Sequence, residues 1–157
     1  RVFAVEPNGP MRAAAEQALG DRPGFVGVAA TAEATTLPDA AIDLVTASQA
    51  FHWFEPAATR REWARILRPG GSAALIWNDR HSSGSPFAEE YEQLLVTHGD
   101  NYTGVNYRHA GDAQVRAFFG GDHVRRAAFP WVERFDLDKL QRRLLSASYA
   151  PVAGQPG

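Results

Sequence analysis

The segment from Ile42 to Gly71 constrains the fold more than any other part of the chain. An apolar stretch, Ile42–Ala47, leads through the aromatic turn Phe51–Phe54 into a helical pattern that ends before Leu67-Arg68-Pro69-Gly70-Gly71. A second apolar stretch, Ala73–Trp77, follows. Two apolar stretches of strand length, joined by one helix and bounded by turn residues, predict a βαβ unit of a parallel sheet.

Polar side chains follow both of these strands. Because the carboxyl ends of parallel strands meet at one edge of a sheet, residues there usually line a ligand crevice. In this chain they are Ser48, Gln49, His52, Asn78 and Asp79. The sequence therefore predicts a binding crevice at this edge.

The rest of the chain extends the alternation of strand and helix, which predicts an open, doubly wound α/β sheet. Strands are expected at Val2–Val5, Phe25–Ala29, Ile42–Ala47 and Ala73–Trp77, and helices from Pro10 to Gly20 and from Pro56 to Leu67, the latter with Trp63, Ile66 and Leu67 facing the sheet. Beyond Arg80 we expect a helix from Pro86 with Phe87, Tyr91, Leu94 and Leu95 on one face, a strand at Val124–Phe135 interrupted at Pro130, and a helix from Asp136 with Leu140, Leu144 and Leu145 inward. One domain is expected over residues 1–157, with a core at 1–80, a cap over the crevice at 81–121, and a C-terminal strand and helix at 122–149.

Composition excludes several classes of protein. A chain of 157 residues with 45% hydrophobic and 22% charged residues is typical of one globular domain. The net charge of −2 gives no general attraction to nucleic acid or acidic membranes, and no apolar run approaches membrane-spanning length. The absence of cysteine excludes disulfides and thiol nucleophiles, and it fits the cytoplasmic location that we expect. The five histidines lack the paired spacing of a zinc helix, so no metal site is expected.

Glu6 is the first candidate for ligand binding. It ends the first strand, and a carboxylate there can accept hydrogen bonds from both vicinal hydroxyls of a ribose. Met11 and the turn Thr31-Ala32-Glu33 are expected nearby, where they offer an apolar side chain and polar groups to an adenine ring. The alternative is that Glu6 is a solvated surface residue.

Four segments, in this order and spacing, resemble class I S-adenosylmethionine-dependent methyltransferases, and among them the small-molecule branch that includes trans-aconitate methyltransferase. They are Val2-Phe3-Ala4-Val5-Glu6-Pro7 with Met11, Ala30-Thr31-Ala32-Glu33, Asp43 to Phe54, and Leu67-Arg68-Pro69-Gly70-Gly71. The resemblance covers residues 2–80 and, more loosely, 87–149. It implies a Rossmann-like, mostly parallel sheet with a helical cap insertion, S-adenosylmethionine as cofactor, and transfer of a methyl group to a small-molecule acceptor by in-line displacement.

The resemblance also implies roles for cofactor-binding residues. Glu6 would bind the ribose hydroxyls, and Met11 would pack on the adenine. Thr31 occupies a position where the family often has an aspartate that meets the adenine amino group, so a hydroxyl or the Ala32 backbone amide is expected to replace that contact. Ser48 and Gln49 would hold the methionine part of the cofactor.

His52, Trp53 and Trp77 are the expected acceptor-side residues. His52 and Trp53 would point towards the sulfonium and the acceptor, where an imidazole with a pKa near neutrality can accept a proton or orient a carboxylate. The alternative for His52 is a structural role, as a helix cap or as part of an aromatic cluster. Trp77 would line the acceptor pocket or pack in the core or cap.

A family feature is missing from this chain, since no Gly-x-Gly-x-Gly pattern occurs in it. The resemblance places the glycine-rich loop and its strand before Arg1, centrally between the strands at Val2–Val5 and Ile42–Ala47, and a last strand after Gly157. We therefore expect a fragment that is incomplete at both ends.

Residues 1–157 alone are predicted to fold poorly and to bind the cofactor weakly. Each buried, unpaired backbone group at the two open sheet edges costs about 1 to 3 kcal/mol, against a native stability of about 5 to 15 kcal/mol. A cofactor titration of the isolated chain measures this, and micromolar affinity would contradict the prediction.

Two alternatives remain open at this point. A nicotinamide-dependent dehydrogenase also places an acid after this first strand, although the turn at residues 48–54 followed by residues 67–71 favours methyl transfer. A non-catalytic partner subunit or remnant would keep the sheet without binding the donor.

Overall fold

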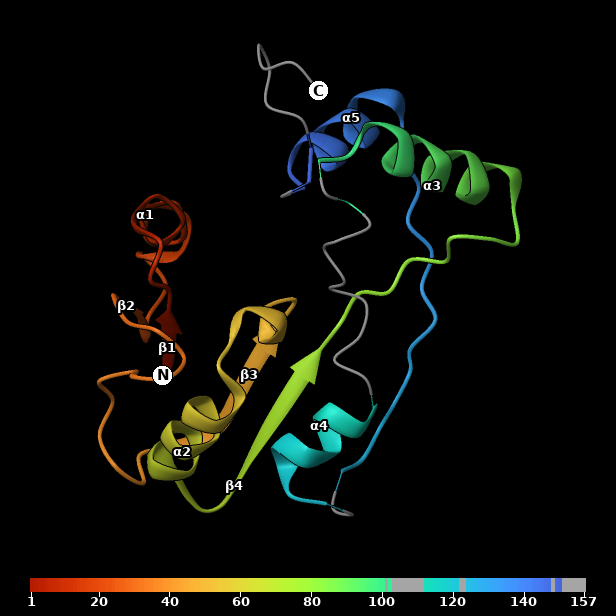
Figure 1. The fold of residues 1–157 in the computed structure, drawn as a ribbon. Helices are drawn as coiled ribbons and strands as arrows, with labels where there is room; N and C mark the ends of the chain where they lie inside the picture. Colours follow the sequence, from red (N-terminus) through yellow and green to blue (C-terminus); the bar gives the residue numbers. More distant parts are fainter. Residues whose placement is uncertain (101, 103–111, 122–123, 148, 151–157) are drawn as a thin grey trace. The chain divides into compact units, whose positions relative to one another are not determined.

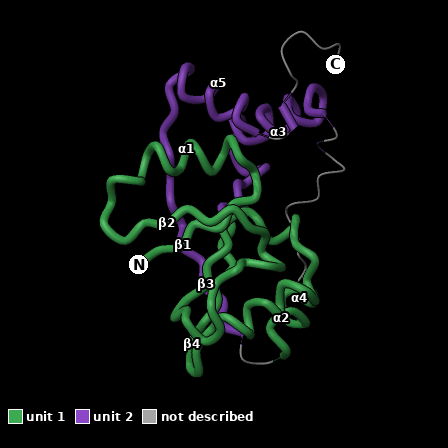
Figure 2. Tube along the Cα trace, turned by 90° about the vertical axis from the view of Figure 1, so that its left-hand side faces the viewer, with its two compact units in different colours: residues 1–77, 110–123 green, residues 78–109, 124–157 purple. Residues whose placement is uncertain are grey.

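The structure is a computed structural model, and it describes residues 1–100, 102, 112–121, 124–147 and 149–150. The chain divides into two compact units, residues 1–77 with 110–123 and residues 78–109 with 124–157 (Figure 2). The first unit holds strands and helices, and its strands pair in parallel. The predicted α/β class with a parallel sheet is confirmed.

The first unit opens with a parallel strand pair, β1 (Val2–Val5) and β2 (Phe25–Val28), connected by α1 (Gly9–Leu19). The helix α1 begins because the Asn8 side chain accepts a hydrogen bond from the Met11 N–H at 3.0 Å. It begins one residue before the predicted start at Pro10 and ends, as predicted, before Gly20.

A second parallel pair consists of β3 (Ile42–Ser48) and β4 (Leu67–Ile76), joined by the 3-10 turn η1 (Phe51–Trp53) and by α2 (Pro56–Ile66) (Figure 1). This is the predicted βαβ unit. The strand β4 begins at Leu67, earlier than expected, because Leu67 already pairs with Ile42 before the register shifts. Gly70 makes this irregularity possible, since its φ of 80° is a left-handed conformation that side chains disfavour.

One face of α2 packs on an aromatic core. Trp63 and Ile66 are buried, as predicted, and Leu67 is half-buried. The core cluster consists of Ala47, Phe51, Trp63 and Phe118. Phe118 comes from α4 (Asp112–Phe119), a helix in the region that we expected to cap the crevice. The cap prediction for residues 101 and 103–111 lies outside the described residues.

In the part of the chain that the structure describes, the four strands form two separate two-stranded sheets, β1–β2 and β3–β4. The chain passes from one to the other through residues 29–41. Backbone hydrogen bonds from Ala40 and Ala41 to the carbonyls of Arg65 and Ile66, at 2.9 and 2.8 Å, hold the end of this loop on the C-terminus of α2.

The second unit contains α3 (Pro86–His98) and α5 (Leu137–Leu145). Leu95 of α3 is buried, as the helical pattern indicates, but Phe87 and Leu94 are exposed. In α5, Leu140 and Leu144 are half-buried whereas Leu145 is 69% exposed, so its predicted inward position is wrong. Leu145 is the last residue of α5, and its side chain lines a small hollow beside Leu94 and Leu95 of α3 rather than a closed core.

The predicted strand at Val124–Phe135 is not present. Residues 124–136 have no regular secondary structure, and Phe129, Trp131 and Val132 are exposed. The apolar, aromatic composition suits a strand, but a strand also needs a partner for its backbone hydrogen bonds. Within the described residues no strand pairs with this segment, and Pro130 has no N–H to offer.

Candidate functional site

Glu6 lies at the carboxyl end of β1, level with the end of β2. Val5 is paired with Val28, and the Glu6 N–H donates to the Val28 carbonyl at 3.0 Å. One oxygen of the Glu6 carboxylate accepts the Asn8 N–H at 2.8 Å. The carboxylate is therefore held at the edge of the sheet by the first residues of the turn into α1.

The turn that follows β2 leaves the same edge. Thr31 and Ala34 form an isolated antiparallel bridge, with the Ala34 N–H donating to the Thr31 carbonyl at 3.3 Å. Met11, in the first turn of α1, is 61% exposed. The structure thus gives Glu6, Thr31 and Ala32 positions at neighbouring strand ends, as the sequence predicted.

Ser48 and Gln49 end β3 in a strained turn. The Gln49 N–H donates to the Ile76 carbonyl at 3.0 Å, which extends the pairing with β4 by one residue. Gln49 has a φ of 52°, a left-handed conformation for a residue that is not glycine. Such strain persists only where the surrounding structure enforces it, and it is frequent at ligand sites.

The turn η1 sends its aromatic side chains in opposite directions. Phe51 is 2% exposed in the core, whereas Trp53 is 69% exposed. His52 is half-buried, with its ring centre 4.9 Å from that of Trp53. Burial lowers the pKa of His52 below its ordinary value of 6.5, so the imidazole is neutral near pH 7.

Trp77, directly after β4, packs on the core. Its ring lies edge-on to Phe51, with 6.3 Å between the ring centres. This contact supports the packing role, and the acceptor-side role of Trp77 stays a prediction. Asn78, in the second unit, accepts a hydrogen bond from the Trp131 indole N–H at 3.1 Å.

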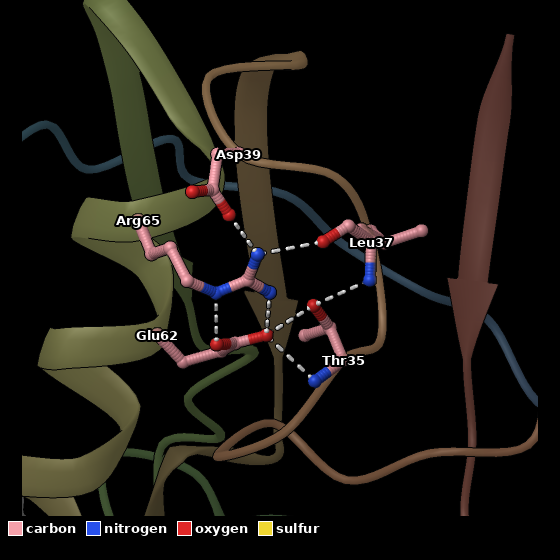
Figure 3. Close-up of polar contacts among 5 residues, drawn as sticks. All are labelled: Thr35, Leu37, Asp39, Glu62 and Arg65. Carbon is pink, nitrogen blue, oxygen red and sulfur yellow. Dashed lines mark hydrogen bonds and ion pairs between the residues drawn. The ribbon is translucent and has the colours of Figure 1, made fainter.

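A polar cluster that the sequence analysis missed lies on the inward face of α2 (Figure 3). The Glu62 carboxylate accepts two bonds from the Arg65 guanidinium, at 2.8 and 2.7 Å, and two from Thr35. The Arg65 hydrogen bonds lower the pKa of Glu62 to about 2, and they outweigh the opposing effect of burial. The only sequence signal was Glu62 itself, an acid at an inward position beside Trp63.

A hollow of about 510 Å³ lies between α2 and α4, and it is lined by Pro56, Ala57, Arg60, Arg61, Ala64, Gln114, Ala117 and Phe118. None of the predicted site residues lines this hollow. The predicted residues lie instead at the strand ends and in the first helical turns that follow them, in one set after β1 and β2 and another after β3 and β4. Among the described residues no group of three or more His, Asp or Glu side chains is placed to hold a metal ion, and no helix is long and apolar enough to cross a membrane.

The first unit matches a known family over almost the whole length of its strands. Residues 1–75 match the family described as "Methyltransferase domain". Residues 1–75 belong to the methyltransferase domains. The match decides against a nicotinamide-dependent dehydrogenase, because it includes the turn after β3 and the start of β4 as well as Glu6.

Curated relatives carry the same family name. An uncharacterised methyltransferase of Mycobacterium tuberculosis is 43% identical over 79 residues, which are 50% of this chain and 31% of the relative. An uncharacterised methyltransferase of Schizosaccharomyces pombe is 30% identical over 118 residues, 75% of this chain and 45% of the relative. This chain therefore spans less than half the length of these relatives.

One solved structure is also similar. It is a putative type II methyltransferase from Anaeromyxobacter dehalogenans, 30% identical, with a TM-score of 0.48 and coverage of 85% of this chain and 52% of that chain.

Proposed function

We propose that this chain forms the donor-binding part of an S-adenosylmethionine-dependent methyltransferase that acts on a small-molecule acceptor. The observation that carries the proposal is the shared edge of β1 and β2, where Glu6 and the Thr31–Ala32 turn emerge from paired residues, Val5 and Val28. A carboxylate beside an exposed polar turn offers one group for a ribose and another for the attached base.

The side chains at this edge suit an adenosyl group. An ionised carboxylate has about four acceptor sites. The Asn8 N–H occupies one site on Glu6, so the carboxylate retains capacity for two ribose hydroxyls. The exposed thioether of Met11 offers an apolar surface for the flat face of a base.

Bound S-adenosylmethionine would supply an electrophilic methyl group, which passes to the acceptor while the electrons of the broken C–S bond stay on sulfur. The protein's contribution would be alignment, which alone can supply a large part of the acceleration. We assign this to the strained turn of Ser48 and Gln49, on the donor side, and to His52 and Trp53, on the acceptor side.

His52 is predicted to act as the base for acceptors that lose a proton. Because burial lowers its pKa, the neutral, proton-accepting form prevails at neutral pH, and activity should fall as the pH drops through a value below 6.5. A profile of kcat/KM against pH measures this, and the inflection should be absent in His52→Gln. An inflection that survives in His52→Gln would assign it to another group.

Titration of the full-length gene product with S-adenosylhomocysteine tests the function directly. We expect saturable binding, and methyl transfer from labelled S-adenosylmethionine to a small molecule in a metabolite mixture. NADH serves as the control ligand and should not bind. A folded protein that binds neither ligand would instead favour the non-catalytic remnant.

A further inference from the structure

The loop between β2 and β3 is mostly exposed, but three of its residues are buried. Thr35 is 3% exposed, and Ala30 and Leu37 are 9% exposed. Thr36 and Ala40 adopt φ values of 61° and 49°, which residues other than glycine rarely adopt. A loop can be held in such a state only if neighbouring groups satisfy its polar backbone and enforce its conformation.

The first anchor of this loop is Glu62 of α2 (Figure 3). Its Oε1 atom accepts the Thr35 N–H at 2.8 Å and the Thr35 hydroxyl at 2.5 Å. Arg65, which holds Glu62 from the other side, also donates to the Leu37 carbonyl at 2.8 Å and to Asp39 at 2.5 Å. Charge-assisted bonds of this kind are among the stronger hydrogen bonds in proteins, so the middle of the loop is tied firmly to α2.

The second anchor is Glu33, at the start of the same loop. Its Oε1 atom accepts the Glu55 N–H at 3.0 Å and the hydroxyl of the buried Thr59 at 3.4 Å. Burial raises the pKa of Glu33, but the hydrogen bonds from the Glu55 N–H and the neighbouring hydroxyls lower it by more. The net pKa is below its ordinary value, so the carboxylate stays ionised. Glu55 caps α2 and follows Trp53 by two residues. Glu33 thus joins the Thr31–Ala32 turn to the chain that leaves the aromatic turn.

We propose that Glu33 and the Thr35–Glu62–Arg65 cluster form a two-point clamp that positions Thr31 and Ala32 for the adenine end of the donor. These are positioning residues, and the inference rests on the proposed function. A loop that is already ordered binds its ligand without the conformational cost of ordering, so the clamp contributes to donor affinity. It does not touch the groups that react, so the rate at saturating donor is independent of it.

The test is Thr35→Val in the full-length gene product, because valine keeps the shape and removes the hydroxyl, which donates to Glu62 and accepts from the Leu37 N–H at 3.4 Å. Because these hydrogen bonds act on the donor only through the order of the loop, we expect a smaller effect than the loss of a direct bond would have, a rise of about 3- to 10-fold in the Kd of S-adenosylhomocysteine and in the donor KM. We expect kcat to change less than about two-fold by the same argument, and the Thr35 amide to exchange hydrogen faster. Thr35→Ser should restore the parent values. Thr97→Val, on the surface of α3, is the matched control and should leave all of these values unchanged.

Each outcome is decisive. Thr35→Val with parental Kd and KM would overturn the clamp, and so would a fall in kcat at unchanged KM, which indicates only a loss of folded protein. Should Thr35→Val fail to unfold cooperatively, Glu33→Ala tests the other anchor with the same measurements and the same expected rise in Kd. Absence of donor binding by the parent protein would overturn the proposed function itself, which distinguishes that failure from failure of the clamp alone.

Discussion

Glu6→Ala is expected to weaken the binding of S-adenosylhomocysteine by on the order of 100-fold or more. Hydrogen bonds to a charged group contribute about 1.5 to 3 kcal/mol each, and two ribose hydroxyls would lose their acceptor together. Since about 1.4 kcal/mol corresponds to a tenfold change in affinity, even the lower values give about a hundredfold loss. Titration calorimetry on the full-length gene product measures the Kd of S-adenosylhomocysteine for the variant and the parent.

Two controls separate this effect from general damage. Asp21→Ala removes another acid, from the exposed turn after α1, and should leave the Kd unchanged. A 2′-deoxy analogue of the ligand should bind the parent more weakly than the ribose form, and Glu6→Ala should lose this discrimination. Equal affinities of Glu6→Ala and the parent would place the ribose elsewhere and remove the main support for the proposed function.

Phe51→Ala is expected to lower the free energy of unfolding by about 3 to 5 kcal/mol. Phe51 is 2% exposed, and its ring contacts Phe54, Trp77 and Phe118 with centre separations of 6.1, 6.3 and 4.8 Å. Its removal would leave a cavity where the end of β3, the end of β4 and α4 meet. Because native stability is about 5 to 15 kcal/mol, the variant should lose a large part of it.

Urea denaturation followed by circular dichroism measures this change, with Trp53→Ala as the matched control. Trp53 lies in the same turn but is 69% exposed, so its truncation should alter stability by less than about 0.5 kcal/mol. Similar losses in the two variants would show that the turn, rather than the buried ring, determines stability.

The sequence predicted the parts of the fold that depend on local patterns. The βαβ unit was predictable because apolar stretches of strand length, a helix with Trp63 and Ile66 on one face, and Pro69-Gly70-Gly71 all agree. The helix α4 was not, because its few apolar residues show no clear period by themselves. Phe118 is inward only because α2, far away in sequence, provides a surface for it.

The candidate site divides in the same way. Glu6 and Gln49 were found because residues at strand ends can be read directly from the pattern. Glu62 was missed, because an acid on a helix is usually solvated. Only the hydrogen bonds from Thr35 and Arg65, which the folded chain brings to its carboxylate, make it a buried anchor. The assignment of Glu6, Met11, Thr31, Ala32, Ser48, Gln49, His52 and Trp53 to donor and acceptor stays a prediction.

For this protein, local sequence determined where strands and helices form, which residues stand at the strand ends, and the methyltransferase family. These properties depend on apolar periodicity and turn residues within windows of about ten to twenty residues, so they can be read from the sequence alone. Tertiary structure alone decided that Phe51 is buried and Trp53 exposed, that residues 124–136 do not form a strand, and that Glu62 holds the loop after β2. Each of these depends on a partner distant in the sequence, because burial and hydrogen bonding require two surfaces, and a local pattern describes only one.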